Sequence, residues 1–233
     1  SDVTLAAGNT YKLSGEYIVE EGATLHIEEG VKIIAVYDDI ADYILVKQGG
    51  KINAVGTPDK PIVMTSEKEE PGAWGGIHIC GRAHTNAEGG KGSSEIGGAV
   101  YGGNDDADNS GTLQYIRLEY TGFAFDEEHE ANGISFYGVG NGTIVDHCQA
   151  YKGSDDGFEF FGGSVNVSNL VAVSCSDDSF DWTEGWNGKG TNLVAYQEAE
   201  STLGYDCDCL MECDNNGSNN AATPVAHPVL KNL

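Results

Sequence analysis

Two acidic phrases in the chain have the residue types and spacing that could do chemistry. The first reads DDGFEF and starts at Asp155, and the second reads DDSFDW and starts at Asp177, 22 residues later. Carboxylate oxygens are the ligands that Ca²⁺ prefers, and the ion takes about six to eight of them in flexible geometry. The candidate calcium ligands are therefore Asp155, Asp156, Asp177, Asp178 and Asp181.

The same phrases also have a purely structural interpretation. An Asp ahead of Gly or Ser is common at turns, where its oxygen accepts a nearby backbone N–H. If the two copies stack about 4.8 Å apart, a pair of like charges repels by about 1 kcal/mol in water and by roughly 3 to 4 kcal/mol at an effective dielectric near 20. Backbone donors, raised carboxyl pKa values or a bound cation would offset that repulsion. Both interpretations remain open at this stage.

A weaker cation candidate lies in the segment NDDADNSG. Asn104, Asp106 and Asp108 alternate there, as the oxygens do at the start of a calcium loop. The later bidentate Glu of an EF-hand is missing. We therefore treat these three residues as a secondary prediction.

Aromatic residues beside the acidic phrases could supply a platform for sugar rings. In the segment 158–161, strand alternation puts Phe158 and Phe160 on one face and Glu159 with Phe161 on the other. Because Glu159 should face outward, the sequence predicts an exposed Phe161, and Trp186 is the second exposed candidate.

The elements that must position these residues are short strands that recur along the chain. Runs of four to eight residues with alternating polarity, such as SVNVSNLVAV, are separated by Gly, Asn or Asp corners. Segments 133–156 and 157–178 align as repeating units, and a third begins at residue 179. A repeat of about 22 residues built only from strands predicts an all-β, right-handed parallel β-helix. An antiparallel sandwich would require hairpin turns and would leave the repeated phrase unexplained.

We expect residues 1–233 to form a single β-helix domain. The Gly-rich, polar segment 81–111 interrupts the stack, and a loop of that size is either functional or disordered. A shorter interruption spans 126–132. Because the last residues are strand-like with no turn after them, we expect the natural chain to continue beyond Leu233.

Charge and composition restrict the partners. Twelve basic residues against 37 acidic ones give a net charge of −25, which argues against nucleic acid as a partner, because that binding needs clustered Lys and Arg. No run of 18 apolar residues is present, so we expect no transmembrane segment. The six cysteines permit disulfides in an oxidising compartment, or they could be small buried hydrophobes.

Several motifs resemble those of secreted or surface-anchored β-helix proteins of Bacteroidota. The motifs are WGG at Trp74, the segment 101–122, SDDGFEFFGG at 154–163 and DNNGSNNAATP at 214–224. The resemblance implies an extracellular or outer-membrane location, with a lipid anchor on a residue outside this sequence as one option. It supports the fold and this location and says little about chemistry. The first functional hypothesis is a non-catalytic protein that binds a glycan or a protein partner, such as an accessory lipoprotein of an uptake system, because Lys and Arg that could hold an acidic polymer are few.

The acidic repeat is also similar to the calcium site of family 9 pectate lyases, which are parallel β-helices too. Carried over, the resemblance implies that Asp155 or Asp156 joins Asp177, Asp178 and Asp181 around Ca²⁺. The function it implies is calcium-dependent polysaccharide lyase activity on acidic glycans, with a lysine as the base. Lys189 is the candidate base, although its spacing departs from that of the family. The non-catalytic binding protein is therefore the first hypothesis and the lyase is the alternative.

Overall fold

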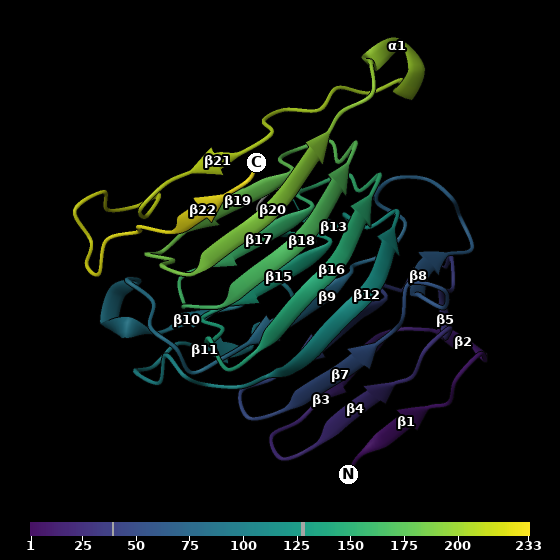
Figure 1. Ribbon diagram of the computed structural model, residues 1–233, viewed down its shortest axis with the longest axis horizontal. Coiled ribbons are helices and arrows are strands. Elements are labelled where there is room, and N and C mark those ends of the chain that lie inside the picture. Colours follow the sequence, from purple (N-terminus) through teal and green to yellow (C-terminus); the bar gives the residue numbers. More distant parts are fainter. Residues whose placement is uncertain (39, 127–128) are drawn as a thin grey trace.

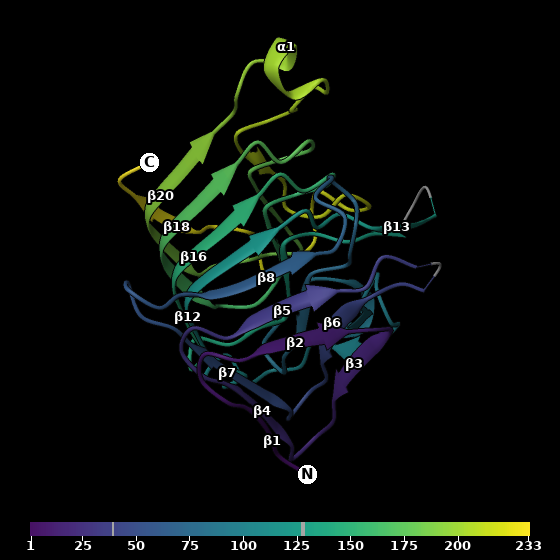
Figure 2. The ribbon, with the colours of Figure 1, turned by 90° about the vertical axis from the view of Figure 1, so that its right-hand side faces the viewer.

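The chain winds into a right-handed parallel β-helix, as the sequence predicts. The computed structural model describes residues 1–38, 40–126 and 129–233. Within these residues every long strand pairs in parallel with the strands of the coils before and after it. The N-terminus lies in the first coil and the C-terminus at the opposite end of the stack (Figures 1 and 2).

One face of the stack is a sheet with seven strands among the described residues. Each coil contributes one short strand to it, and Phe158 pairs with Phe180 of the next coil. The strands in spatial order are β3 (Glu16–Val19), β6 (Tyr43–Val46), β9 (Ile77–Cys80), β15 (Ile134–Tyr137), β17 (Phe158–Phe161), β19 (Phe180–Thr183) and β21 (Glu212–Cys213).

The other two faces belong to a sheet with eleven strands among the described residues. In the early coils these faces carry separate strands, and the later coils join them in one long strand, because β12 pairs with both β7 and β8. The strands are β1 (Val3–Leu5), β2 (Thr10–Leu13), β4 (Thr24–Ile27), β5 (Lys32–Ala35), β7 (Lys51–Val55), β8 (Ile62–Ser66), β12 (Gly111–Glu119), β16 (Ile144–Tyr151), β18 (Asn166–Val173), β20 (Lys189–Tyr196) and β22 (Val229–Lys231).

The long strands bend where one residue adopts a left-handed conformation. Asn169, Asn192 and Asn232 have φ of 55°, 57° and 58°, a region that Asn tolerates better than most residues. Their side chains form a ladder, in which Asn192 Nδ2 donates to Asn169 Oδ1 at 2.8 Å and Asn232 Nδ2 donates to Asn192 Oδ1 at 2.8 Å. The ladder fixes the corner of the coil and the register between coils.

Stacked side chains fill the interior. Phe136, Phe160 and Trp186 form one column, with ring centroids 5.0 Å apart between the first two and 4.1 Å apart between the last two. Phe158 stacks on Phe180 at 5.5 Å. Each coil thus buries its aromatic residues against the same positions of its neighbours, and apolar burial is the main favourable contribution to folding.

Excursions between strands interrupt this regular stack. Segment 81–111, which could have been functional or disordered, is an ordered excursion that buries Ile96 and Tyr101 against the seven-stranded sheet. It carries the short helix η1 (Glu88–Gly90) and the strand pair β10 (Gly92–Ser93) and β11 (Val100–Tyr101). A second strand pair and a short helix lie further along the chain, as β13 (Ala124–Asp126), β14 (His129–Glu130) and α1 (Glu200–Leu203).

Each of the six cysteines is a free thiol in the described chain. Cys80, Cys148 and Cys175 are buried, and burial raises the pKa of each thiol to about 12. These three cysteines therefore act as small buried hydrophobic residues and form no disulfides.

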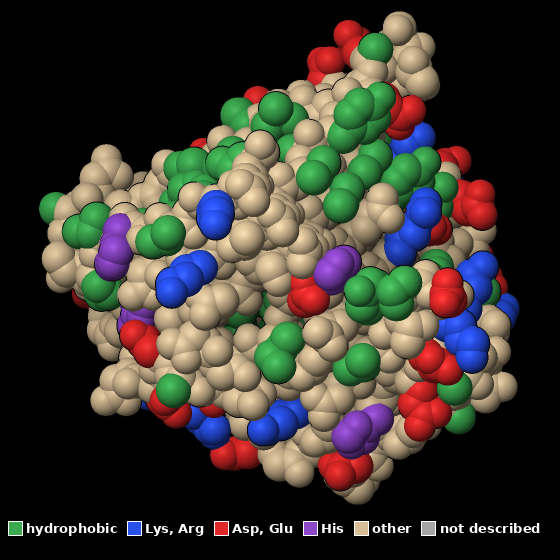
Figure 3. Space-filling view, viewed as in Figure 1, with side chains coloured by type: hydrophobic (Ala, Val, Ile, Leu, Met, Phe, Trp, Pro, Cys, Tyr) green, Lys and Arg blue, Asp and Glu red, His purple; other side chains and the backbone are tan. Residues whose placement is uncertain are grey.

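One outer face of the stack carries exposed hydrophobic side chains. Hydrophobic side chains gather over the outer face of the eleven-stranded sheet (Figure 3), including the exposed Ile144, Val194 and Tyr196. No helix among the described residues combines the length and the hydropathy needed to cross a bilayer.

The aromatic column predicts a large effect of truncation in the core. We expect Phe160→Ala to lower the free energy of unfolding by about 3–5 kcal/mol, because it removes a fully buried ring from between two others. Urea denaturation would measure the loss. The control Tyr196→Ala removes a ring that is 57% exposed, so its effect should stay near about 0.5 kcal/mol. Equal losses in the two variants would contradict the packing described.

Candidate cation site

Nine acidic side chains converge on one small cavity beside the seven-stranded sheet. Its volume is about 190 Å³, and we call it the acidic pocket. Its lining residues are Glu95, Glu130, Asp155, Asp156, Glu159, Asp177, Asp178, Asp181 and Glu212. No Lys or Arg lies among these described lining residues.

Strand register produces the first column of carboxylates. Glu159 in β17 pairs with Asp181 in β19, and Asp181 pairs with Glu212 in β21. In a parallel sheet, paired residues point to the same face. The inward ring of Phe158 therefore forces Glu159 outward, and the next two coils repeat the arrangement. Asn132 Nδ2 donates to Glu159 Oε2 at 2.6 Å, which fixes the deepest carboxylate of this column.

The Asp pairs form a second set at the corners ahead of these strands. Asp156 Oδ1 accepts the backbone N–H of Asp178 at 2.9 Å, and Asp178 Oδ1 accepts that of Cys209 at 2.8 Å. The structural interpretation is thus confirmed for the second Asp of each pair, because Asp156 and Asp178 anchor the corner of the following coil. At Gly157 a Cβ would lie 2.7 Å from the carbonyl oxygen of Ser179, so the corner packs closely there. Each of these two bonds uses one carboxylate oxygen, and both side chains also line the pocket.

Two groups of three carboxylates are close enough to share an ion. Ligand oxygens of Asp155, Asp156 and Asp177 lie within 4.8 Å of one another, and so do those of Asp156, Glu159 and Asp181. Asp156 belongs to both groups and is only 5% exposed. The donor set consists wholly of hard oxygens, which suits Ca²⁺ better than a soft metal.

Burial and mutual repulsion favour protonated carboxyls in this pocket. Burial, together with the charge of Glu130, raises the pKa of Asp155 to about 7. Burial also raises the pKa of Asp178 to about 7 and that of Asp181 to about 6. The pKa of Glu159 lies well above its ordinary value because the side chain is buried beside Asp156. Without a counter-charge, the pocket therefore holds protons at neutral pH.

Three of the nine carboxylates lie outside the repeated phrase. Glu95 lies in segment 81–111, and burial raises its pKa to about 7. Glu130 comes from the segment 126–132, of which residues 127 and 128 lie outside the described residues, and Glu212 begins β21. The sequence analysis identified the interruptions 81–111 and 126–132, but the repeat does not encode where Glu95 and Glu130 return to the stack.

The secondary calcium prediction concerns Asn104, Asp106 and Asp108, whose two carboxylates have protein donors of their own. Asp106 Oδ1 accepts from the backbone N–H of His84 at 3.0 Å and lies 2.8 Å from its ring Nδ1, while Asp108 Oδ2 accepts the Arg82 N–H at 2.7 Å. These bonds tie the beginning of segment 81–111 to its later part. Among the described residues the three side chains form no ligand cluster.

Lys189 does not lie among the residues of the acidic pocket. It begins β20 in the eleven-stranded sheet, where it lines a separate depression with Asn166 and Thr191. The structure therefore does not bring this lysine together with the carboxylates that resemble a lyase calcium site.

The prediction that Phe161 and Trp186 are exposed is wrong. Trp186 is 1% exposed and stacks on Phe160, and Phe161 is 7% exposed and stacks on Tyr137 at 4.4 Å. Strand alternation did put Phe161 on the outer face of β17, but segment 81–111 covers that face. Neither ring offers a platform for a sugar.

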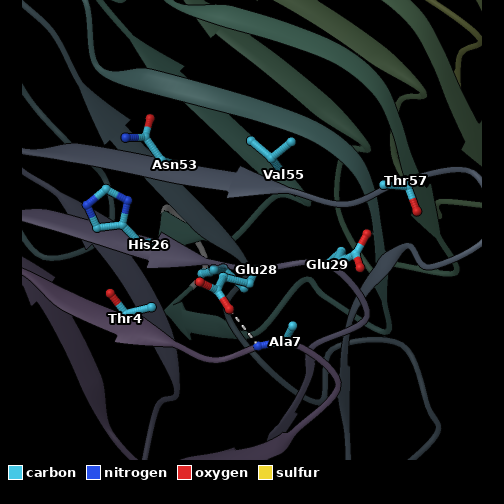
Figure 4. A pocket seen from close by; sticks show the side chains of 9 residues that line it. Thr4, Ala7, His26, Glu28, Glu29, Asn53, Val55 and Thr57 are labelled. Carbon is cyan, nitrogen blue, oxygen red and sulfur yellow. Dashed lines mark hydrogen bonds between the residues drawn. The ribbon is translucent and has the colours of Figure 1, made fainter.

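A wider depression of about 720 Å³ lies over β1, β4 and β7 (Figure 4). Thr4, His26 and Asn53 occupy one row across these strands. Glu28 points toward the neighbouring loop, where its Oε2 accepts the Ala7 N–H at 2.9 Å. A single imidazole and two separated carboxylates provide much less chemistry than the acidic pocket does.

Comparison with known proteins yields one match. The model of a family described as a pectate-lyase-like beta helix domain matches residues 1–233. No curated protein and no solved structure matches the chain significantly.

The raised pKa values predict how stability depends on pH. A carboxyl whose pKa is higher in the folded state contributes stability below its unfolded pKa and loses it as the pH rises through the folded value. For Asp155 and Asp178 that window runs from 3.8 to about 7. We therefore expect the Tm of metal-stripped protein to fall between pH about 4 and about 7, as followed by circular dichroism in chelator. Asp155→Asn/Asp178→Asn should flatten this fall, and a wild-type Tm that rises over the window would contradict the prediction.

Proposed function

The chain belongs to the pectate-lyase-like β-helix family, and on that premise we propose that its acidic pocket binds Ca²⁺ and, through the ion, a carboxylate of an acidic glycan, without cleaving it. The observation that carries the proposal is the convergence of nine carboxylates, with no basic residue among the described lining residues.

Electrostatics supports a cation as the partner of this pocket. Two carboxylates about 4.8 Å apart repel by roughly 3 to 4 kcal/mol at an effective dielectric near 20, and the pocket contains many such pairs. Protons relieve less of that repulsion as the pH rises through the raised pKa values of about 6 to 7. At higher pH a divalent cation would supply the counter-charge that the described lining residues lack.

The geometry of the outer group supports a role for the ion in binding a ligand. Asp155, Asp156 and Asp177 supply three close oxygens, and Asp177 is exposed. Since Ca²⁺ takes about six to eight oxygens, several positions would remain for water or for an incoming carboxylate. A uronic acid unit provides such a carboxylate. The inner group around Glu159 is more enclosed and would hold an ion mainly through protein oxygens.

The lack of a lysine among the described lining residues favours binding over elimination. A lyase must remove the proton beside the uronate carboxylate, and the general base must come within hydrogen-bond reach of that proton. The described lining residues include no Lys or Arg, and Lys189 lines a different depression. Family membership keeps calcium-dependent lyase activity as the second candidate function.

A location outside the cell would suit such a site. Extracellular calcium modules work with dissociation constants of roughly 10⁻⁴ to 10⁻³ M, and a solvated acidic surface of net charge −25 would concentrate cations. We accordingly place the protein at the cell surface or in the secreted fraction as part of the proposal.

Calorimetric titration of metal-stripped protein with Ca²⁺ tests the cation site. We expect wild type to bind calcium and Asp156→Asn to weaken the affinity at least about tenfold, because Asp156 belongs to both groups of oxygens. The Asn side chain can still accept the Asp178 N–H, so the corner should persist. The matched control is Asp59→Asn, an exposed carboxylate outside the pocket. No calcium uptake by wild type, or equal affinity in wild type and Asp156→Asn, would refute the site.

Incubation with polygalacturonate in calcium distinguishes binding from cleavage. Eliminative cleavage creates an unsaturated product that absorbs in the ultraviolet, and we expect no such absorbance, since no Lys lies among the described lining residues and Lys189 lines a different depression. Retention of the protein on immobilised polygalacturonate should nevertheless require calcium. A steady rise in absorbance would make the lyase the correct function, and Lys189→Ala would then test the candidate base.

A further inference from the structure

A second cavity adjoins the acidic pocket and has different chemistry. Its volume is about 650 Å³, and it lies between residues 86–88 of segment 81–111 and residues 216–219 near the C-terminus. Thr183 and Glu184, at the end of β19, line it as well. We call this cavity the amide groove.

Hydrogen bonds between its two walls build the groove. Asn216 Nδ2 donates to Asn86 Oδ1 at 2.9 Å, and Asn86 Nδ2 donates to the carbonyl oxygens of Asn215 at 2.9 Å and Pro224 at 3.0 Å. Asn86 and Asn216 are both buried. Their amides tie segment 81–111 to a loop about 130 residues later in the chain, so the walls are fixed relative to each other.

The groove and the acidic pocket lie next to each other along the same strand, and we call the two together the trough. Asp181 lines the pocket and Thr183 lines the groove. The two residues are two positions apart on β19, so they point to the same face and lie about 6.6 Å from each other along the strand. Segment 81–111 contributes Glu95 to the pocket and Glu88 to the groove. The C-terminal loop likewise begins at Glu212 in the pocket and continues into the groove.

The polar groups of the groove suit sugar hydroxyls and disfavour a second negative charge. The described lining residues include Glu88 and Glu184 but no Lys or Arg. Glu184 accepts from Tyr101 Oη at 2.9 Å and Thr85 Oγ1 at 2.6 Å, and a carboxylate has further lone pairs to offer. Among the described residues, no protein group hydrogen-bonds the Ser218 hydroxyl or the Glu88 carboxylate. Hydroxyls could bind here, whereas a carboxylate would face two acids without a counter-charge.

We propose that the trough recognises a mixed glycan, in which one unit binds through its carboxylate in the acidic pocket and the adjacent unit, in the amide groove, is uncharged. This inference rests on the proposed calcium-dependent binding and adds the class of glycan to it. The strongest ligand is then neither a neutral polymer nor a fully charged one. Among uronic acid polymers, a partially esterified chain has this composition.

Two galacturonate trimers provide the probes. One carries a single free carboxylate and two methyl esters, and the other carries three free carboxylates. For calcium-loaded wild type we expect the singly charged trimer to bind at least about threefold more tightly, because the groove repels a second carboxylate. The reverse preference, or no binding of either trimer to calcium-loaded protein, would overturn the inference.

A side chain added at Gly217 tests the groove without touching the pocket. A Cβ there would meet only Asp214 Oδ2, at 3.6 Å, and the backbone needs no positive φ, so Gly217→Tyr should fold and fill the groove. We expect it to weaken binding of the singly charged trimer at least about tenfold while leaving the affinities for calcium and for monomeric galacturonate unchanged. Ser201→Tyr, on the exposed α1, is the matched control. Trimer binding by Gly217→Tyr at the wild-type level would overturn the inference.

A charge change at Glu88 provides an independent test. Glu88→Lys replaces an exposed acid of the groove with a base, so it should raise affinity for the fully charged trimer at least about threefold. An unchanged preference between the trimers would contradict the assignment.

The outcomes separate this inference from the proposed function. If wild type takes up no calcium, the proposed function fails and the inference fails with it. A different outcome would contradict only the inference about the groove. In that outcome wild type binds calcium, Asp156→Asn abolishes trimer binding, and Gly217→Tyr binds the trimer as wild type does.

Discussion

In-register parallel stacking is the constraint on which the rest of the structure depends. Each coil places equivalent residues directly above those of the coil before, so Phe158 meets Phe180 and Glu159 meets Asp181. The same geometry is favourable for apolar residues and costly for charged ones. On the inner side of the seven-stranded sheet it builds continuous aromatic columns, and on the outer side it forces carboxylates together. The aromatic core and the acidic pocket thus result from the same in-register stacking.

The repeated Asp residues serve both the scaffold and the pocket. Asp156 and Asp178 anchor the following coil through backbone N–H groups, which explains their position at the corners. Both side chains also line a cavity where burial and like charges raise the carboxyl pKa values. A purely structural corner would require one Asp per coil, whereas this surface adds Asp155, Asp177 and three glutamates from elsewhere. That surplus makes the pocket a candidate for function.

The repeat made the architecture predictable, and the excursions limited what could be predicted of the site. The spacing of DDGFEF and DDSFDW gave the coil length and the alignment of Glu159 with Asp181, since strand periodicity fixes which side chains share a face. It could not place Glu95 or Glu130, because their positions depend on loop paths that no periodicity describes. It also missed Glu212, because a longer loop separates β21 from β19 and hides the strand register that aligns Glu212 with Asp181. The same limitation caused the error at Phe161, where the correct face of the strand was covered by a distant segment. Trp186 follows the strand and turns inward, where it packs on Phe160.

Segment 81–111 leaves the stack after β9 and returns at β12, and the backbone pairing of the coils continues on either side of it. Its length is therefore independent of the coil length, and the same holds for the loop that follows β21. Insertions or deletions in these two walls would reshape the trough while the hydrogen-bonded ladder stayed intact. Relatives built on this scaffold could thus diversify their ligands through these two excursions alone, much as antibodies vary loops on a constant framework.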